Sequence, residues 1–331
     1  MPTRGRQAPR GPGGERPAPV AVAVVSWNTR ELLERCLESL ADEVRGGRAD
    51  VWVVDNGSSD GSAEAARRQA PWATVVEPAS NLGFGRAVNL VARRTRGPWL
   101  MATNADIALD PGALETLLDA GEDPGVGSVA PRLTLPGGET QQSVHPLPTV
   151  PFTLAFNLGL HSLSPRLADR LCLPHPRNAH RPRDVPWAIG ACLLLRRTAF
   201  EAVGGFDERQ WMYGEDLDLG WRLRQAGWRT RYEPRAAVRH ESGAATRQAF
   251  GNAQVQEFMA ATYAMLLRRR GFARAWATAA INVAGAAARL AWMVPLKARL
   301  ADGAERVDAT WGWLVAHREG LRRLPTLRDG S

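Results

Sequence analysis

The chain has 331 residues, of which 44% are hydrophobic and 23% are charged, as in a folded globular protein and unlike a disordered chain. Its net charge of +8 comes almost entirely from arginine, since Lys297 is the only lysine. A basic chain attracts nucleic acids, anionic lipids and phosphorylated substrates alike, so charge alone does not select the function.

Three features bear on the cellular compartment. Residues 1–18 are rich in Pro, Gly and Arg and have no apolar core, which predicts a disordered basic tail and not a signal peptide. Cys36, Cys172 and Cys192 are far apart and odd in number, so they indicate neither a disulfide framework nor a CxxC metal site. No stretch reaches the roughly 18–20 uninterrupted apolar residues of a spanning helix. We therefore expect a cytoplasmic protein.

The first part of the chain alternates between strands and helices. Four buried strands are predicted at 20–27, 50–55, 73–76 and 99–106, and helices follow them. Asn28 is a candidate N-cap, with Glu31 completing a capping box, and Asp110–Pro111 is a second candidate helix start. This alternation predicts an α/β sheet that is largely parallel.

Polar residues stand at the carboxyl ends of three of these strands. They are Ser26–Trp27–Asn28, Asp55–Asn56–Gly57 and Asn104–Ala105–Asp106. Ligands bind at this edge of open α/β sheets, so we expect the three clusters to lie together there. Neither GxGxxG, GxxxxGK[ST] nor GxSxG is present, which disfavours dinucleotide-binding dehydrogenases, P-loop enzymes and serine hydrolases.

The pattern loosens over residues 136–186, a long segment that is functional or disordered by its length. Its histidines, His145, His161, His175 and His180, have no metal-site spacing, and we expect exposed loop residues. A buried strand is predicted at 187–197, and two short strands at 229–234 and 236–240, the second ending in His240.

Three carboxylates, Glu215, Asp216 and Asp218, stand together in "YGEDLDLGWRL", which begins an amphipathic helix. They have two interpretations. Acids in a first helical turn interact favourably with the exposed N–H groups and the helix dipole. Alternatively, they are catalytic.

The C-terminal part is helical by its pattern. Residues 272–300 are Ala-rich, with Trp276 and Trp292 as apolar anchors and with arginines and Lys297 flanking them. Such a helix fits the surface of a membrane, while packing as domain core or as an oligomer contact is the alternative.

Six sequence motifs together resemble the inverting glycosyltransferases of family 2, which have the GT-A fold. The resemblance is closest to the bacterial rhamnosyltransferase-like branch of that family. The motifs cover about residues 20–245 and read "VVSWNTRELLERCLESL", "VWVVDNGSSDGS", "NLGFGRAVN", "NADIAL", "GACLLLRRTAFEAVGGFDERQWMYGEDLDLGWRLRQAGW" and "RHESG". The resemblance implies a GT-A domain at 19–245, which lies between the disordered tail expected at 1–18 from its composition and the helical extension expected at 246–331 from its pattern. Within the domain it implies a nucleotide-sugar half at about 19–135 and an acceptor half at about 136–245.

The resemblance also implies roles for strand-end residues. Asp106 matches the acidic motif that holds Mg²⁺ or Mn²⁺ on the diphosphate of the donor, and Asn104 replaces the first acid of that motif. His240 matches a histidine at the metal or diphosphate. Ser26, Asn28, Asp55, Arg86 and Asn104 are the implied nucleotide-sugar contacts. The alternatives are ordinary polar strand ends, a solvated surface position for Arg86 and a core histidine for His240.

The same resemblance implies that Asp216 is the general base and that Glu215 orients the acceptor or the base. Asp218 simply starts the helix. An inverting transfer needs a carboxylate beside the acceptor hydroxyl, on the side opposite the departing diphosphate. Neighbouring acids also raise one another's pKa, which suits a base.

The expected function is transfer of a hexose or deoxyhexose, with rhamnose the first candidate, from a dTDP or UDP sugar. The expected acceptor is a hydroxyl of a cell-envelope glycan or of a polyprenyl-linked sugar, and contact with the inner face of the plasma membrane would accompany it. A non-catalytic protein that binds nucleotide sugars or glycans is the alternative. Nucleic-acid binding lacks any supporting motif.

Overall fold

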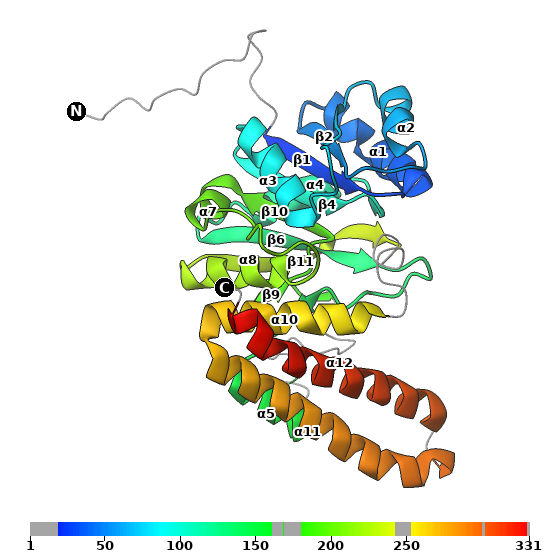
Figure 1. Ribbon diagram of the computed structural model, residues 1–331. Coiled ribbons are helices and arrows are strands. Elements are labelled where there is room, and N and C mark those ends of the chain that lie inside the picture. Colours follow the sequence, from blue (N-terminus) through cyan, green and yellow to red (C-terminus); the bar gives the residue numbers. More distant parts are fainter. Residues whose placement is uncertain (1–18, 161–167, 169–179, 242–252, 300–301, 330–331) are drawn as a thin grey trace, which may run out of the picture.

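The computed structural model describes residues 19–160, 168, 180–241, 253–299 and 302–329. Its centre is a mixed sheet of nine strands among these residues, with helices on both faces and further helices stacked on the β11 side (Figure 1). The strands of the sheet are β1 (Val20–Ser26), β2 (Ala49–Asp55), β3 (Thr74–Val76), β4 (Trp99–Asn104), β5 (Ile107–Leu109), β6 (Val126–Thr134), β8 (Arg183–Val185), β10 (Cys192–Arg196) and β11 (Arg229–His240). A separate pair is formed by β7 (Val144–His145) and β9 (Trp187–Ala188).

The helices fall into two groups. Those around the sheet are α1 (Arg30–Arg45), α2 (Ser62–Gln69), α3 (Phe84–Arg94), α4 (Ala113–Ala120), α7 (Arg197–Ala202) and α8 (Glu215–Gln225). The others pack together beyond it and are α5 (Val150–Asn157), α10 (Gln254–Arg270), α11 (Phe272–Leu296), the short η4 (Lys297–Arg299) and α12 (Gly303–Asp329).

The strand order is β3-β2-β1-β4-β10-β6-β11-β5, with β8 beside β11. The first four strands are parallel, as predicted. Beyond them the sheet is mixed: β10 runs antiparallel to both β4 and β6, β11 runs parallel to β6, and β5 and β8 run antiparallel to β11. The chain enters β10 where β4 ends, and the Asn104 N–H donates to the Ala191 carbonyl there, so β10 has to run in the opposite direction.

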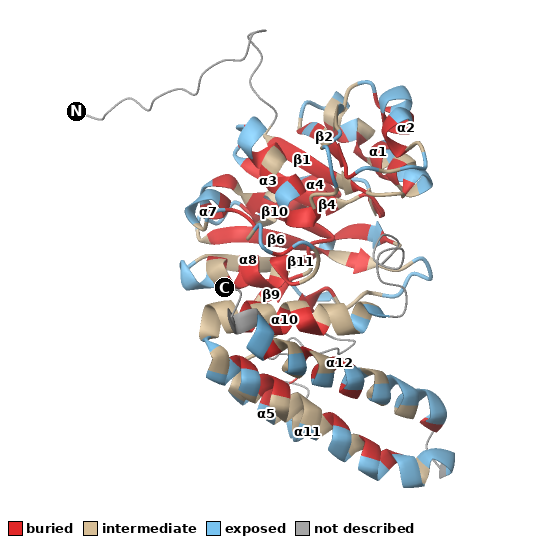
Figure 2. Ribbon diagram, viewed as in Figure 1, coloured by how far each residue is buried: buried red, intermediate tan, exposed pale blue. Residues whose placement is uncertain are grey.

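The apolar residues of β1 explain why helices cover both faces. Val20, Val22 and Val24 belong to one buried cluster with α1, whereas Ala21 and Ala23 belong to another with α3. Successive side chains of a strand point to opposite faces, so a continuous apolar run needs cover on both. Figure 2 shows the resulting buried centre.

Both predicted helix caps are wrong. Asn28 has φ of 50°, and its side-chain oxygen accepts the Ser59 N–H (2.7 Å), so Thr29 takes the N-cap position of α1. Asp110 lies in a turn, and Gly112, with φ of 76°, precedes the first residue of α4. In both places the left-handed residue bends the chain into the helix, and the residue at the N-cap position makes no capping hydrogen bond with its own side chain. At α1 the Asp60 carboxylate accepts the Arg30 N–H of the first turn instead (2.9 Å).

The later strands also differ from the prediction. Residues 187–197 form β9, a turn and β10, in place of one strand. The two short strands predicted at 229–240 are the single strand β11, whose register against β6 shifts between Glu233 and Ala237. Pro234 lies at this irregularity, where its missing N–H interrupts the ladder without ending the strand.

The segment 136–186 contains β7, α5 and β8 within its described residues. His180 is exposed, as expected, and His161 and His175 lie outside the described residues. His145 was expected to be an exposed loop residue, and this is wrong. Its ring stacks on Trp187 with centroids 4.8 Å apart, and burial lowers its pKa to about 4.

The helical extension shares a core with the sheet domain. Trp187 and Leu217 pack in one buried cluster with Tyr263, Leu266 and Ala275. The two halves predicted within the GT-A domain are likewise joined in one sheet, because β10 lies between β4 and β6.

Candidate functional site

A cavity of about 400 Å³ lies at the carboxyl ends of β1 and β4. Six of the predicted site residues line it, namely Ser26, Asn104, Asp106, Glu215, Asp216 and His240. Asn56, from the end of β2, also lines it, so the expected gathering of three strand ends at one edge is confirmed. Asn28, Asp55 and Arg86 are not among the lining residues.

Asp106 and His240 meet in this cavity. Asp106 Oδ1 lies 3.3 Å from His240 Nε2, and both side chains are buried. Neither of these two atoms makes a hydrogen bond, although both are inaccessible to solvent. The other ring nitrogen, His240 Nδ1, lies 2.6 Å from the side-chain oxygen of Gln141, which fixes the orientation of the ring.

The Asp106 oxygen and the His240 nitrogen are of the kinds that bind divalent cations, and their separation of 3.3 Å suits two neighbouring ligands of one cation. Two ligands at right angles, each about 2.1 Å from a cation, lie about 3 Å apart. Among the described residues no group of three or more His, Cys, Asp and Glu side chains could hold a metal ion. A cation here would therefore take its remaining ligands from water or from a bound substrate.

Three predicted contacts support the loops around the cavity. The Ser26 carbonyl accepts the Asn56 N–H (2.8 Å), and the buried Asp55 side chain accepts the Ser58 N–H (2.9 Å). The Asn28 N–H donates to Ser58 Oγ (2.8 Å). These bonds connect the β1–α1 turn to the β2–α2 turn and hold both turns rigidly beside the cavity.

The predicted contact of Arg86 with a phosphate or ribose has no support in this geometry. Its Nε donates to the Glu208 carbonyl (2.7 Å), which holds the loop before α8 against α3. Asn104 lines the cavity as predicted, while its backbone joins β4 to the turn before β10.

The carboxylates of Glu215 and Asp216 have different surroundings. Asp216 Oδ2 accepts the Gly190 N–H (2.9 Å) and Oδ1 accepts the Leu217 N–H (2.7 Å), so this group is fixed from two directions. Glu215 Oε2 is buried and makes no hydrogen bond. Burial, reinforced by the charge of Asp216, raises the pKa of Glu215 to about 8. Burial also raises the pKa of Asp216, but the N–H groups of Gly190 and Leu217 oppose that rise.

A pH dependence of stability follows from Glu215. Its pKa in the folded protein is raised to about 8 from an ordinary value of 4.5, so its stabilising contribution is complete below pH 4.5 and is lost as the pH rises through 8. In metal-free buffer, Glu215→Gln should therefore melt like the wild type near pH 4.5 and at a higher temperature at pH 8 to 9. The difference should be on the order of a few kcal/mol. Melting curves that shift equally at both pH values would contradict it.

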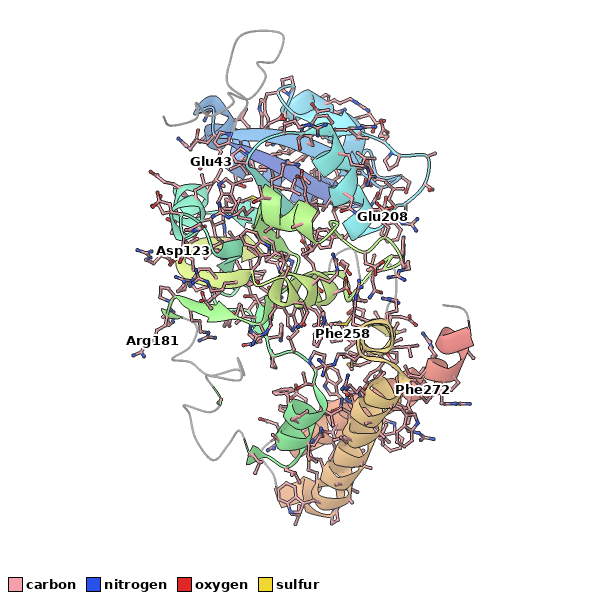
Figure 3. The ribbon with its side chains drawn as sticks, turned by 90° about the vertical axis from the view of Figure 1, so that its left-hand side faces the viewer. Glu43, Asp123, Arg181, Glu208, Phe258 and Phe272 are labelled. Atoms are coloured by element: carbon pink, nitrogen blue, oxygen red, sulfur yellow. The ribbon has the colours of Figure 1, made fainter. Side chains whose placement is uncertain are left out.

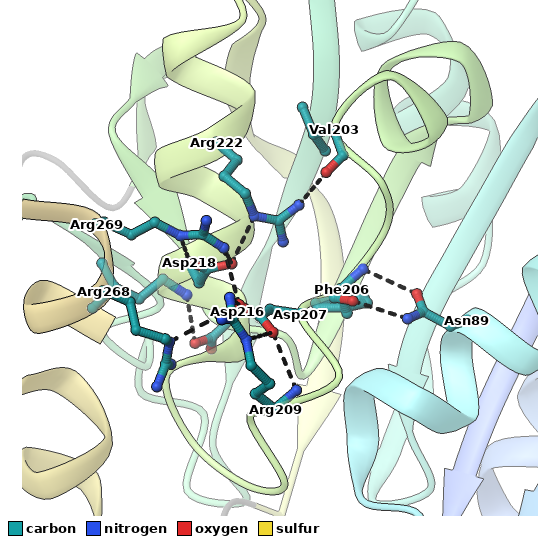
Figure 4. Close-up of polar contacts among 11 residues, drawn as sticks. Asn89, Val203, Phe206, Asp207, Arg209, Asp216, Asp218, Arg222, Arg268 and Arg269 are labelled. Carbon is teal, nitrogen blue, oxygen red and sulfur yellow. Dashed lines mark hydrogen bonds and ion pairs between the residues drawn. The ribbon is translucent and has the colours of Figure 1, made fainter. Parts of the chain in front are cut away.

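Asp218, predicted simply to start the helix, has a larger structural role. It is fully buried and accepts from Arg222 Nε (2.7 Å) and from Arg269 Nε (2.5 Å). Arg269 also donates to Asp207 (3.0 Å), whose pKa hydrogen bonds from Arg209 hold well below its usual range. Figure 4 shows this network, which ties α8 and the loop before it to α10.

Sequence reasoning missed several residues around the cavity. Gly83, with φ of 75°, lies so close to the loop before α8 that a Cβ would collide with the Trp211 carbonyl. Tyr213 has φ of 64° and lines the cavity. The first glycine of "NLGFG", Gly83, was a usable signal of close packing at this loop, whereas Gln141 lies in a segment with no recognisable pattern.

The helical extension closes one side of the cavity. Gln254 and Phe258 of α10 belong to its lining, and the Phe258 ring meets Tyr213 edge to face with centroids 5.8 Å apart. Phe258 lies where α10 approaches the sheet domain (Figure 3). The cavity thus has strand ends on one side and a helix of the extension on the other.

Comparison with known proteins agrees with this architecture. The family model described as glycosyl transferase family 2 matches residues 21–204, and that of glycosyl transferase family group 2 matches residues 178–302. An N-acetylglucosaminyl-diphospho-decaprenol L-rhamnosyltransferase of Mycobacterium tuberculosis is 34% identical over 241 residues, which cover 68% of this chain and 76% of the relative. A pre-mycofactocin glycosyltransferase of the same species is 33% identical over 237 residues, covering 70% of this chain and 45% of the relative.

Two solved structures share the fold. The mannosyltransferase PcManGT from Pyrobaculum calidifontis, in complex with GDP-Man and Mn²⁺, matches with a TM-score of 0.59 at 21% identity. The match covers 97% of this chain and 91% of the mannosyltransferase chain. GalNAc-T7 with UDP, GalNAc and Mn²⁺ matches with a TM-score of 0.51 at 14% identity, and the match covers 68% of this chain and 44% of the GalNAc-T7 chain.

The mixed sheet and the cavity at its strand ends are those of a glycosyltransferase with a GT-A-like fold. The chain belongs to glycosyltransferase family 2, and it is an enzyme and not merely a binding protein of that fold.

Proposed function

We propose that the enzyme transfers a deoxyhexose, with rhamnose as the first candidate, from a nucleoside-diphosphate donor to a hydroxyl of a polyprenyl-linked sugar, with inversion at the anomeric carbon. The observation that carries the chemistry is one cavity that contains both the Asp106–His240 pair and the Asp216 carboxylate. The sugar and the acceptor class come from the mycobacterial rhamnosyltransferase, whose name includes a diphospho-decaprenol substrate.

Asp106 and His240 would hold the divalent cation, Mg²⁺ or Mn²⁺. The two atoms that face each other make no hydrogen bond, which fits that role, and both structural neighbours were solved with Mn²⁺. When bound, the cation would neutralise the charge of the departing diphosphate. Asn104 lies beside this pair at the end of β4 and would contact the same end of the donor.

Asp216 acts as the general base in this proposal. The two backbone N–H groups orient its carboxylate and favour its charged form. It takes the proton of the acceptor hydroxyl while that oxygen bonds to the anomeric carbon and the bond from this carbon to the diphosphate oxygen breaks. Glu215, with a pKa of about 8, is protonated at neutral pH and orients the acceptor by donating a hydrogen bond.

The experiment that tests the function is a transfer assay with dTDP-, UDP- and GDP-sugars and a polyprenyl-diphosphate N-acetylglucosamine acceptor. Transfer from dTDP-rhamnose with inversion is the expected result. Transfer from another donor would overturn the sugar assignment, and retention of configuration would overturn the role of Asp216.

The metal assignment makes a separate prediction. Donor binding to the wild type, measured by calorimetry, should be on the order of tenfold tighter with Mn²⁺ than with chelator. Asp106→Ala should bind donor equally weakly in both conditions, because it removes one of the two proposed ligands. Asp119→Ala, an exposed aspartate outside the cavity, is the control and should behave as the wild type. Undiminished transfer in excess chelator would refute the assignment.

A further inference from the structure

Large apolar side chains are exposed mainly in one region of the described chain. Nine of the eleven lie on α5 and the turn after it, on α11 and on α12, and these are Leu154, Leu158, Leu160, Trp276, Trp292, Val294, Trp311, Trp313 and Val315. Soluble surfaces rarely gather so many apolar side chains, so this region indicates an interaction surface.

Two of these helices form a surface without acids. No residue of α5 is charged, and α11 contains Arg274 and Arg289 but neither Asp nor Glu. The two helices pack together, and Asn157 of α5 bonds to Asn282 (2.9 Å) and Arg289 (3.0 Å) of α11. We call their outward side the α5–α11 face, defined by Leu154, Leu158 and Trp292. Trp276 and Val294 lie on another side of α11, because 16 residues separate Trp276 from Trp292 and turn a helix by about 160°.

The exposed side of α12 is different. Its Trp311 stands among residues of both charges, including the exposed Glu305, Arg306 and Asp308. A surface of mixed charge suits water, whereas an apolar surface without acids suits a lipid headgroup region. The α5–α11 face is therefore the candidate for contact with lipid.

By length and composition α11 is also the one helix among the described residues that could cross a membrane. Its 25 residues span about 37 Å. Only 22% of its most apolar stretch is buried, so it is not an ordinary core helix. Yet one side of it packs along its length through Ala275, Ala279, Ala286, Leu290 and Met293. This geometry favours lying along a membrane surface over crossing it.

Positive charges stand at both ends of α11. Arg270 and Arg274 line a cavity of about 210 Å³ beside the start of α5, and Arg270 stacks over Trp221 at 4.8 Å. Neither arginine forms an ion pair with the described part of the chain. Lys297 is exposed at the other end. These cations match the phosphates of an anionic bilayer.

We propose that the α5–α11 face lies on the surface of an anionic bilayer. Its apolar side chains enter the boundary between headgroups and acyl chains, while the exposed Arg274 and Lys297 meet lipid phosphates. This inference does not depend on the identity of the sugar, and it gives a role to α5, which lies in a segment that the sequence left unassigned.

The test is co-sedimentation of the full chain with phosphatidylcholine vesicles, with and without phosphatidylglycerol. The wild type should bind the anionic vesicles, and salt should weaken binding. Leu158→Glu combined with Trp292→Glu should lower the partition coefficient about tenfold or more, since two anchors are lost from two helices. Trp311→Glu is the matched control, because Trp311 and Trp292 are similarly exposed (56% and 58%). It should bind as the wild type.

Hydrolysis of a soluble nucleotide-sugar donor should be equal in all three proteins, which shows that each is folded. The proposal is overturned if the double variant binds as well as the wild type, or if Trp311→Glu loses as much. It is also overturned if alkaline carbonate fails to extract the protein, which would mean that α11 crosses the bilayer. A lipid-free dimer that the double variant converts to a monomer would instead identify the face as a contact between copies.

Discussion

Replacement of Asp216 by asparagine is expected to lower turnover by roughly two to four orders of magnitude, the range for loss of a general base. Asparagine has nearly the same shape but cannot take the proton of the acceptor hydroxyl. Donor affinity should change little, because donor binding does not use that proton transfer. Initial rates with saturating donor and calorimetric donor binding provide the two measurements.

The contacts of Asp216 refine this expectation. Its two oxygens accept separate N–H groups, from Gly190 and Leu217, and an asparagine oxygen can keep only one of them. The variant should therefore be about 1 kcal/mol less stable than the wild type, in addition to having a lower turnover. Glu215→Gln should lower turnover less, since an amide can still donate a hydrogen bond to the acceptor.

A helix-start role for these acids makes a different prediction. If Asp216 only complements the dipole of α8, Asp216→Asn would be slightly destabilised and fully active. Glu115→Gln is the control, because Glu115 is an exposed acid in the first turn of α4 and lies outside the cavity. Its turnover should be unchanged. Equal activity of the Asp216 and Glu115 variants would reject the catalytic role.

Asp218→Asn is expected to cost about 2 to 3 kcal/mol of stability, somewhat below the usual cost of breaking a buried ion pair because both arginine partners are partly exposed. The amide leaves Arg222 and Arg269 without their shared carboxylate in a fully buried position. Thermal denaturation at neutral pH measures this loss.

Asp110→Asn provides the comparison for Asp218. Asp110 pairs with Arg239 at 3.8 Å on an exposed surface, where an ion pair contributes little. Its variant should melt within experimental error of the wild type. If the Asp218 and Asp110 variants lost the same small amount of stability, the Asp218 network would be no stronger than a surface ion pair.

The sequence was sufficient for the elements around β1 because their signals are local. The runs of valine and the polar strand ends belong to neighbouring residues, and the parallel order of strands places those ends at one edge. The direction of β10 was not predictable in this way. It depends on pairing with β4 across roughly 90 residues of chain, and no short pattern encodes that partner.

The same distinction separates the site residues. The cavity lies at the carboxyl ends of the strands, so residues at those ends line it, namely Ser26, Asn104 and Asp106. Arg86 and Asn28 stand near the same edge, but the Glu208 carbonyl and the Ser59 N–H determine where their side chains point. The partner of Asp218, Arg269, is 51 residues away and on another helix, so only the tertiary structure shows their contact.

The position of β10 in the sheet also affects how the chain folds as it is synthesised. β4 is complete at Asn104, but its free edge stays unpaired until Cys192–Arg196 has been made. At typical rates of translation this interval lasts roughly 5 to 20 s. During that time the nascent chain presents an apolar strand edge of the kind that pairs with other chains. A ribosome that stalls before residue 192 should therefore yield an aggregation-prone product, and chaperone binding should be strongest in this window.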